Sequence, residues 1–150
     1  LLTVTGVQTC ALPISGIVHE EFHSRAAAKR GGVVSMSQLW VNLPRRDKSA
    51  APHYQDIPRD SIPEVSVGGG MVRVIAGEFA GVRGPASTFT PVHVWDMRLK
   101  AGDRVNIVLK DGDTALLPVL QGRVKLNGER EVAASRFVRV RSGSVSQWTF

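Results

Sequence analysis

Residues 90–128, TPVHVWDMRLKAGDRVNIVLKDGDTALLPVLQGRVKLNG, decide the fold, because apolar and polar residues alternate along them in short runs. An alternation of period two places every second side chain on the same face of a strand. Four runs are predicted strands: 90–99, 104–109, 114–120 and 123–126. Two glycine-containing steps are predicted hairpin turns, because glycine accepts the positive φ that such turns require: 111–113 and 127–128.

The segments upstream of this region continue the β pattern. Residues 71–76, MVRVIA, follow the glycine triplet 68–70, and this order predicts a turn and then a strand. In residues 37–43, SQLWVNL, the residues Leu39, Val41 and Leu43 face one way, which predicts another strand. No stretch repeats apolar residues with a period of 3.6 over three turns. Short strands with glycine-rich corners indicate an all-β sandwich or barrel over 61–150.

The remaining segments are less regular. Residues 16–22, GIVHEEF, read as a short strand or strand end, and 25–32 as a loop or one helical turn. Residues 44–63 contain Pro44, Pro52, Pro58 and Pro63, and this composition predicts an irregular linker, with 44–60 as its extent.

Composition excludes several classes of protein. The 150 residues are 43% hydrophobic and 21% charged, values typical of a globular domain. The 19 Lys and Arg give a net charge of +6 but are scattered along the chain, so direct binding of nucleic acid is not expected. No apolar run reaches the ~18 residues that span a bilayer. The single cysteine, Cys10, cannot form an internal disulfide, and we expect a cytoplasmic protein.

The first residues are expected to be foreign to the protein. Residues 4–14, VTGVQTCALPI, match the translation of one reading frame of a common sequencing-library adapter. We therefore interpret 1–14 as a non-native segment that should pack poorly, with genuine sequence starting at about Ser15 or Gly16.

Several strings together carry a family resemblance. GIVHEEFHS (16–24), QLWVNLP (38–44), VRVIAGEFAGVRGP (72–85) and TFTPVHVWDMRLKAG (88–102) resemble the pirin family in order and spacing. The resemblance covers about 16–128 and implies a bicupin, a chain with two antiparallel β-barrels. It implies that 15–43 is the end of the N-terminal cupin barrel, and that 61–150 is an incomplete C-terminal cupin barrel.

The resemblance also implies a metal site. In the family, three His and one Glu of the N-terminal barrel bind a metal, usually iron, and a GI-x-H-x-E motif supplies two of these ligands. That motif matches His19 and Glu21, which are two residues apart and so project from one face of a strand. Imidazole and carboxylate suit iron. The HPHRG-type motif with the other two histidines is absent from this chain. Glu21 is also our candidate for a catalytic base.

The other candidate residues have simpler interpretations. Glu20 points to the opposite face of a regular strand, and His23 and His53 are expected to be loop residues in contact with solvent. His93 is expected to be a packed or surface histidine, and Glu78 a structural residue at a bend. The two tryptophans of the strand-like runs are expected to be packing anchors: Trp40 and Trp95.

The resemblance implies competing functions. Some bacterial members are similar to quercetin 2,3-dioxygenases, which implies an oxidoreductase that uses Fe²⁺ or another divalent metal on a flavonol-type small molecule. The mammalian relative contacts transcription factors, which implies a regulatory protein with a protein partner. A third interpretation is an inactive fragment that does not hold iron tightly by itself.

Overall fold

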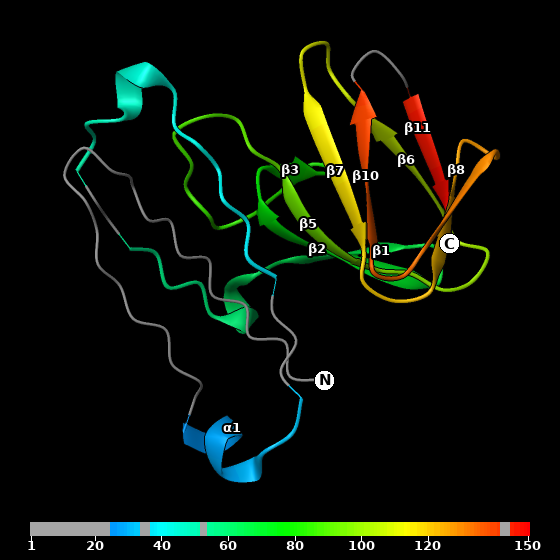
Figure 1. Cartoon of the computed structure of the whole chain (residues 1–150), viewed down its shortest axis with the longest axis horizontal. Coiled ribbons are helices and arrows are strands. Elements are labelled where there is room, and N and C mark those ends of the chain that lie inside the picture. Colours follow the sequence, from blue (N-terminus) through cyan, green and yellow to red (C-terminus); the bar gives the residue numbers. More distant parts are fainter. Residues whose placement is uncertain (1–24, 34–36, 52–53, 142–144) are drawn as a thin grey trace. The chain divides into compact units, whose positions relative to one another are not determined.

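The structure, a computed structural model, describes residues 25–33, 37–51, 54–141 and 145–150, and most of its regular elements are strands (Figure 1). The helical elements are α1 (Arg25–Arg30) and the single 3-10 turns η1 (Arg45–Asp47) and η2 (Arg59–Ser61). The strands are β1 (Glu64–Val67), β2 (Gly70–Ala76), β3 (Glu78–Phe79), β4 (Val82–Arg83), β5 (Val94–Arg98), β6 (Arg104–Val108), β7 (Thr114–Val119), β8 (Arg123–Leu126), β9 (Arg130–Ala133), β10 (Arg136–Arg141) and β11 (Val145–Thr149). The predicted all-β class is confirmed. No helix in the described residues is long and apolar enough to cross a membrane.

The chain divides into two compact units. The first unit takes the described residues up to Pro63 together with Val74–Trp95, and the second takes Glu64–Arg73 together with the described part of Asp96–Phe150. The strands β1, β2 and β5 form a sheet with the order β1-β2-β5.

The second unit holds the longest strand pairings. One sheet has the order β6-β11-β8-β9, and β7 pairs antiparallel with β10 from Arg136↔Val119 to Arg141↔Thr114. Buried and exposed residues alternate along β6 and β8, as the period-two pattern predicts. The buried apolar residues of these strands are Val105, Ile107, Val119, Val124, Leu126, Val132, Val138 and Trp148.

Two glycine turns were predicted correctly. The triplet 68–70 closes the β1–β2 hairpin, in which Val67 pairs with Gly70. Asp103 holds this turn in place: its Oδ1 accepts a hydrogen bond of 2.9 Å from Gly69 N, and its Oδ2 accepts one of 2.8 Å from Lys100 N. Residues 127–128 close the β8–β9 hairpin, and both Asn127 and Gly128 have positive φ, as a tight hairpin turn requires.

The first unit has a small core built partly by the proline-rich stretch. Ile57 and Ile62 are buried with Ile75 of β2, and Ala86 and Val94 pack against them. Gln55 adds a polar clamp, because its Oε1 accepts a hydrogen bond of 2.8 Å from Ser87 N and its Nε2 donates one of 2.9 Å to Ser87 O. The stretch has the irregular backbone that its prolines predict, yet its second half packs as part of this unit.

The prediction of a strand at 37–43 is wrong. These residues form no regular element, and Leu39, Trp40 and Val41 are exposed, with Trp40 at 78%. A strand is stable when a neighbour satisfies its backbone N–H and C=O groups, and none of the described residues pairs with this run. The expectation that Trp40 anchors packing is wrong for the same reason.

Two further local predictions need correction. Residues 111–113 form a turn but not a hairpin, because β6 pairs with β11 and β7 pairs with β10. The run 90–99 yields a shorter strand, β5, which begins at Val94. Pro91 has no N–H to contribute to a strand ladder, which explains the later start. The predictions for 1–14 and 16–22 concern residues that lie outside the described part of the chain.

Candidate functional site

The predicted metal ligands His19 and Glu21 lie outside the described residues, as do Glu20, His23 and His53. Their assignment therefore stays a prediction. Within residues 25–33, 37–51, 54–141 and 145–150, no three His, Cys, Asp or Glu side chains form a group that could hold a metal ion. The described part of the chain therefore supplies no complete set of metal ligands.

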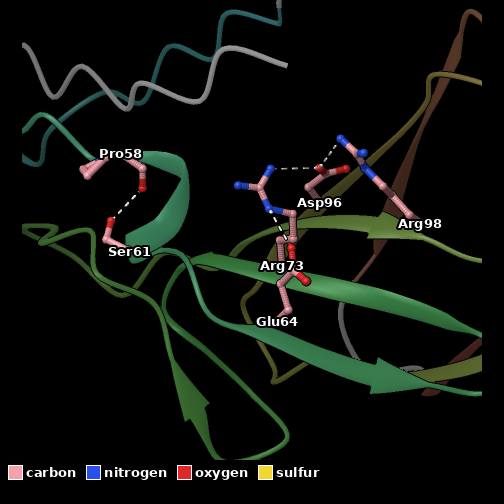
Figure 2. Close-up of polar contacts among 6 residues, drawn as sticks. All are labelled: Pro58, Ser61, Glu64, Arg73, Asp96 and Arg98. Carbon is pink, nitrogen blue, oxygen red and sulfur yellow. Dashed lines mark hydrogen bonds and ion pairs between the residues drawn. The ribbon is translucent and has the colours of Figure 1, made fainter. Parts of the chain in front are cut away.

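Arg73, the buried charged residue of the described chain, is 1% exposed and belongs to a cluster of four charged side chains. The Arg73 guanidinium lies 3.7 Å from Glu64 Oε1 through Nε and 3.7 Å from Asp96 Oδ2 through Nη1. Arg98 Nη2 lies 3.4 Å from the same Asp96 oxygen. Figure 2 shows the Asp96 carboxylate between the two guanidinium groups. We call these four residues the Arg73 cluster.

The strands fix the geometry of the Arg73 cluster. Glu64 of β1 is the direct cross-strand partner of Arg73 on β2, so their side chains start from neighbouring Cα positions. Asp96 and Arg98 are two residues apart on β5, the other neighbour of β2, and so project from the same face. Two positive and two negative groups therefore meet across three strands.

The balance of charge defines what the Arg73 cluster can do. A buried guanidinium is tolerated when carboxylates compensate its charge, and both carboxylates here face an arginine. This arrangement joins three strands and leaves no carboxylate poised as a general base. Sequence reasoning missed it, although the signal was present: Arg73 stands inside the otherwise apolar run MVRVIA.

A short polar contact shapes the chain just before β1. Ser61 Oγ donates a hydrogen bond of 2.7 Å to the carbonyl oxygen of Pro58, and this contact closes the turn η2 (Figure 2). Proline sets the extended backbone at the start of that turn, where φ of Pro58 is −66°. The contact is structural and has no chemical group aimed at a ligand.

His93 is the described histidine, and it is exposed and packs against Trp95, in agreement with the prediction of a packed or surface histidine. Its Nδ1 accepts a hydrogen bond of 3.1 Å from the backbone N of Glu78, so the proton of the neutral ring is on Nε2. The centroid of the His93 ring lies 5.4 Å from that of the Trp95 ring. The Trp95 and Phe79 rings pack edge to face, with their centroids 5.3 Å apart. A Cβ at Gly77 would collide with the His93 ring, and φ there is +70°, so the bend requires glycine.

Asp103 is held in its ionised form by two backbone N–H groups. The hydrogen bond from the backbone N–H of Gly69, followed by that from Lys100, lowers the pKa of the Asp103 carboxyl below its usual value. Both bonds stabilise the ionised form, and they tie the β1–β2 turn to the loop before β6. This role is also structural.

Comparison with known proteins identifies relatives over most of the chain. No family model matches. A protein of Pseudomonas aeruginosa named "Putative quercetin 2,3-dioxygenase" is 44% identical over 120 residues, which are 77% of this chain and 41% of that protein. Mouse pirin is 33% identical over 109 residues, covering 73% of this chain and 36% of pirin. The crystal structure of quercetin 2,3-dioxygenase from Acinetobacter baumannii superposes with a TM-score of 0.68 at 35% identity, over 73% of this chain and 39% of that one.

The strand content and the structural match define the class first: this is an all-β protein with the cupin fold. The named relatives then define the family, and the chain belongs to the pirin-like proteins of that superfamily. The chain spans less than half of the length of these relatives.

Proposed function

We propose that this chain is part of a longer pirin-like protein that acts as an iron-dependent oxidoreductase of the quercetin 2,3-dioxygenase type. The observation that carries the proposal is the 44% identity over 120 residues to a relative with that name, supported by the structural match to a quercetin 2,3-dioxygenase. The proposed substrate is a flavonol-type small molecule, and the proposed location is cytoplasmic.

Within this proposal, His19 and Glu21 are two of the metal ligands. Their imidazole and carboxylate are donor types that iron accepts, and Glu21 is also the candidate base. Two donors do not complete a site, and no group of three such donors lies within the described residues themselves. When bound, the metal would supply coordination of the substrate oxygens and a path for electrons.

Metal analysis of two proteins tests the proposal. The chain of 150 residues should retain little iron after purification, whereas a longer protein that includes an HPHRG-type segment should retain about one equivalent. In the longer protein, His19→Ala should abolish most iron loading and quercetin oxidation. His93→Ala is the matched control, because His93 is exposed and belongs to no described metal group, and it should change neither quantity.

Two outcomes would contradict this proposal. Equal iron loading with and without His19 would show that the ligand assignment is wrong. Iron retained by the 150-residue chain alone would show that further ligands, such as Glu20 or His23, complete a site within it.

The second candidate function is that of a non-enzymatic pirin-like protein that binds a protein partner. The observation behind it is that mouse pirin matches 73% of this chain at 33% identity. A longer protein that loads iron but does not consume oxygen with quercetin would favour this candidate. The third interpretation, an inactive fragment, applies to the 150-residue chain whichever of the two functions the longer protein has.

A further inference from the structure

The turn between β8 and β9 places an exposed side-chain amide directly before a glycine nitrogen. Asn127 and Gly128 are both exposed, and their φ angles are +50° and +72°. The hydrogen bond that closes the turn runs from Glu129 N to Leu126 O over 3.0 Å, so its donor is not the Gly128 nitrogen. A Cβ built at Gly128 would meet no atom within 4 Å, so the space around this residue is open to water.

This pair of groups can react with each other. The Gly128 nitrogen loses its proton to hydroxide and forms a bond to Cγ of Asn127, while the C–N bond of the side-chain amide breaks and ammonia leaves. The product is a five-membered cyclic imide. Water then opens the ring at one of its two carbonyls, which leaves either an aspartate with the normal backbone or an isoaspartate, in which the chain runs through the former side chain. The reaction needs water and base but no oxidant or reductant.

The other two asparagines of the sequence are less suited to this reaction. Asn42 precedes a leucine, and its Oδ1 accepts a hydrogen bond of 3.1 Å from Lys48 Nζ. Asn106 lies within β6, which pairs with β11, and it precedes Ile107, whose branched side chain crowds its own nitrogen. Glycine has no side chain to crowd its nitrogen, and it allows the widest range of backbone rotation. These differences single out Asn127.

The folded turn holds the two reacting atoms apart. A φ of +50° places Asn127 in the left-handed region, where the bond to the next nitrogen points away from Cβ. The Gly128 nitrogen therefore reaches Cγ only after Asn127 leaves this conformation and the turn opens. The strands on either side oppose that opening, because they pair from Arg123↔Ala133 to Leu126↔Arg130 and bury Val124 and Val132 at 1% and 6% exposure.

We propose that Asn127 is a site of spontaneous deamidation whose rate is set by opening of the β8–β9 turn. The closed turn protects the amide, and each opening exposes it to the attack of the Gly128 nitrogen. This modification involves neither the proposed metal ligands nor the proposed substrate, so it does not depend on the proposed function.

The isoaspartyl product should keep the turn from closing normally. It adds one methylene to the backbone between Leu126 and Arg130, which pair across the hairpin. A tight turn has a fixed number of backbone atoms and fixed φ values, so the added atom moves β9 out of register with β8. Both products also put a negative charge beside Glu129 and lower the net charge of the chain from +6 by one.

The test follows the 150-residue chain during incubation at mildly alkaline pH, which promotes loss of the Gly128 proton. Peptide mapping by liquid chromatography and mass spectrometry separates the asparagine, aspartate and isoaspartate forms of each site. In the chain unfolded by urea, Asn127 should convert while Asn42 and Asn106 remain amides. In the folded chain, Asn127 should convert at least about tenfold more slowly than in urea.

A pair of valine variants tests whether the turn controls the rate. Val132→Ala removes buried methyl groups from β9 and should raise the rate in the folded chain about tenfold, because it favours the open hairpin. Val108→Ala is the matched control, since Val108 is 73% exposed on β6, and it should change the rate less than twofold. Circular dichroism checks that both variants fold.

Amide hydrogen exchange gives a second measurement that needs no variant. The factor by which folding slows deamidation should agree, within about threefold, with the protection of the Glu129 N–H, the donor that closes the turn.

Three results would overturn the proposal. The first is an Asn127 amide that survives in the unfolded chain as long as those of Asn42 and Asn106. The second is an equal rate of conversion in the folded and unfolded chain. The third is a slowing by folding that differs from the protection of the Glu129 N–H by more than about tenfold, together with equal rates in folded Val132→Ala and Val108→Ala.

Discussion

Two runs of similar sequence pattern have different structures in this protein. SQLWVNL at 37–43 and RVNIV at 104–108 both alternate apolar with polar residues. The second run is strand β6, paired with β11 from Val145↔Val108 to Thr149↔Arg104, and Val105 and Ile107 are buried. The first run forms no strand, and Leu39 and Val41 are exposed.

The difference shows that alternation is compatible with a strand but is not sufficient to form one. The pattern decides which side chains would share a face, whereas a partner strand decides whether the backbone groups are satisfied and whether that face is covered. β6 has such a partner about 40 residues further along the chain, and 37–43 has none among the described residues. Substitutions in the two classes of segment should therefore differ strongly in their effect on stability.

The largest effect is expected from a charge placed in β6. Ile107 is 3% exposed, so Ile107→Asp buries a carboxylate without a partner and should lower the free energy of unfolding by about 3–5 kcal/mol. Val41→Asp, at a position 46% exposed, should change it by less than about 0.5 kcal/mol. Urea unfolding followed by circular dichroism measures both. Equal losses in the two variants would mean that 37–43 is covered in solution.

The next largest effect is expected at the Arg73 cluster. Arg73→Met leaves Glu64 without its cross-strand cation and should cost about 3 kcal/mol, the lower end for a buried pair, because both carboxylates keep some contact with water. Arg98→Met removes a guanidinium that is 44% exposed and should cost less than about 1 kcal/mol. The same urea unfolding experiment compares the two variants. A loss at Arg98 as large as that at Arg73 would contradict the structural assignment of the cluster.

A smaller effect is expected at the clamp of the proline-rich stretch. Gln55→Ala removes both hydrogen bonds to Ser87 and should lower the free energy of unfolding by about 1 kcal/mol. Gln38→Ala, in the unpaired run 37–43, is the matched control and should have no measurable effect, since Gln38 is exposed. Thermal unfolding of the two variants under identical conditions gives the comparison. Equal melting temperatures would show that the clamp contributes nothing to stability.

The smallest effect is expected from Asp103 and depends on pH. Its folded-state pKa is lower than its ordinary value of 3.8, so the stability that the carboxylate adds is fully present above that value. This contribution is lost as the pH falls through the folded-state pKa. The difference in unfolding free energy between wild type and Asp103→Asn should therefore shrink as the pH is lowered from 5 toward about 2. A difference that stays constant over this range would show that the hydrogen bonds do not depend on ionisation.

The local pattern of the sequence was sufficient for much of the fold. Period-two alternation predicted β6, β7 and β8 within one residue of their observed ends, because burial of one strand face selects the pattern directly. The glycine turns at 68–70 and 127–128 followed from backbone conformation alone. The resemblance to pirins, carried by strings such as QLWVNLP and VRVIAGEFAGVRGP, predicted the cupin class that the structural match confirms. The ligand pair His19 and Glu21 stays a prediction.

The tertiary structure alone decided the features that depend on distant residues. It paired β6 with β11 and β7 with β10, so that the turn at 111–113 joins strands of different sheets. It left 37–43 without a partner among the described residues, and it placed Glu64 and Asp96 beside Arg73, where their charges make burial of a guanidinium possible. Alternation and turn chemistry are properties of neighbouring residues in the chain. Pairing and charge compensation depend on which segments meet after folding, and no local pattern contains that information.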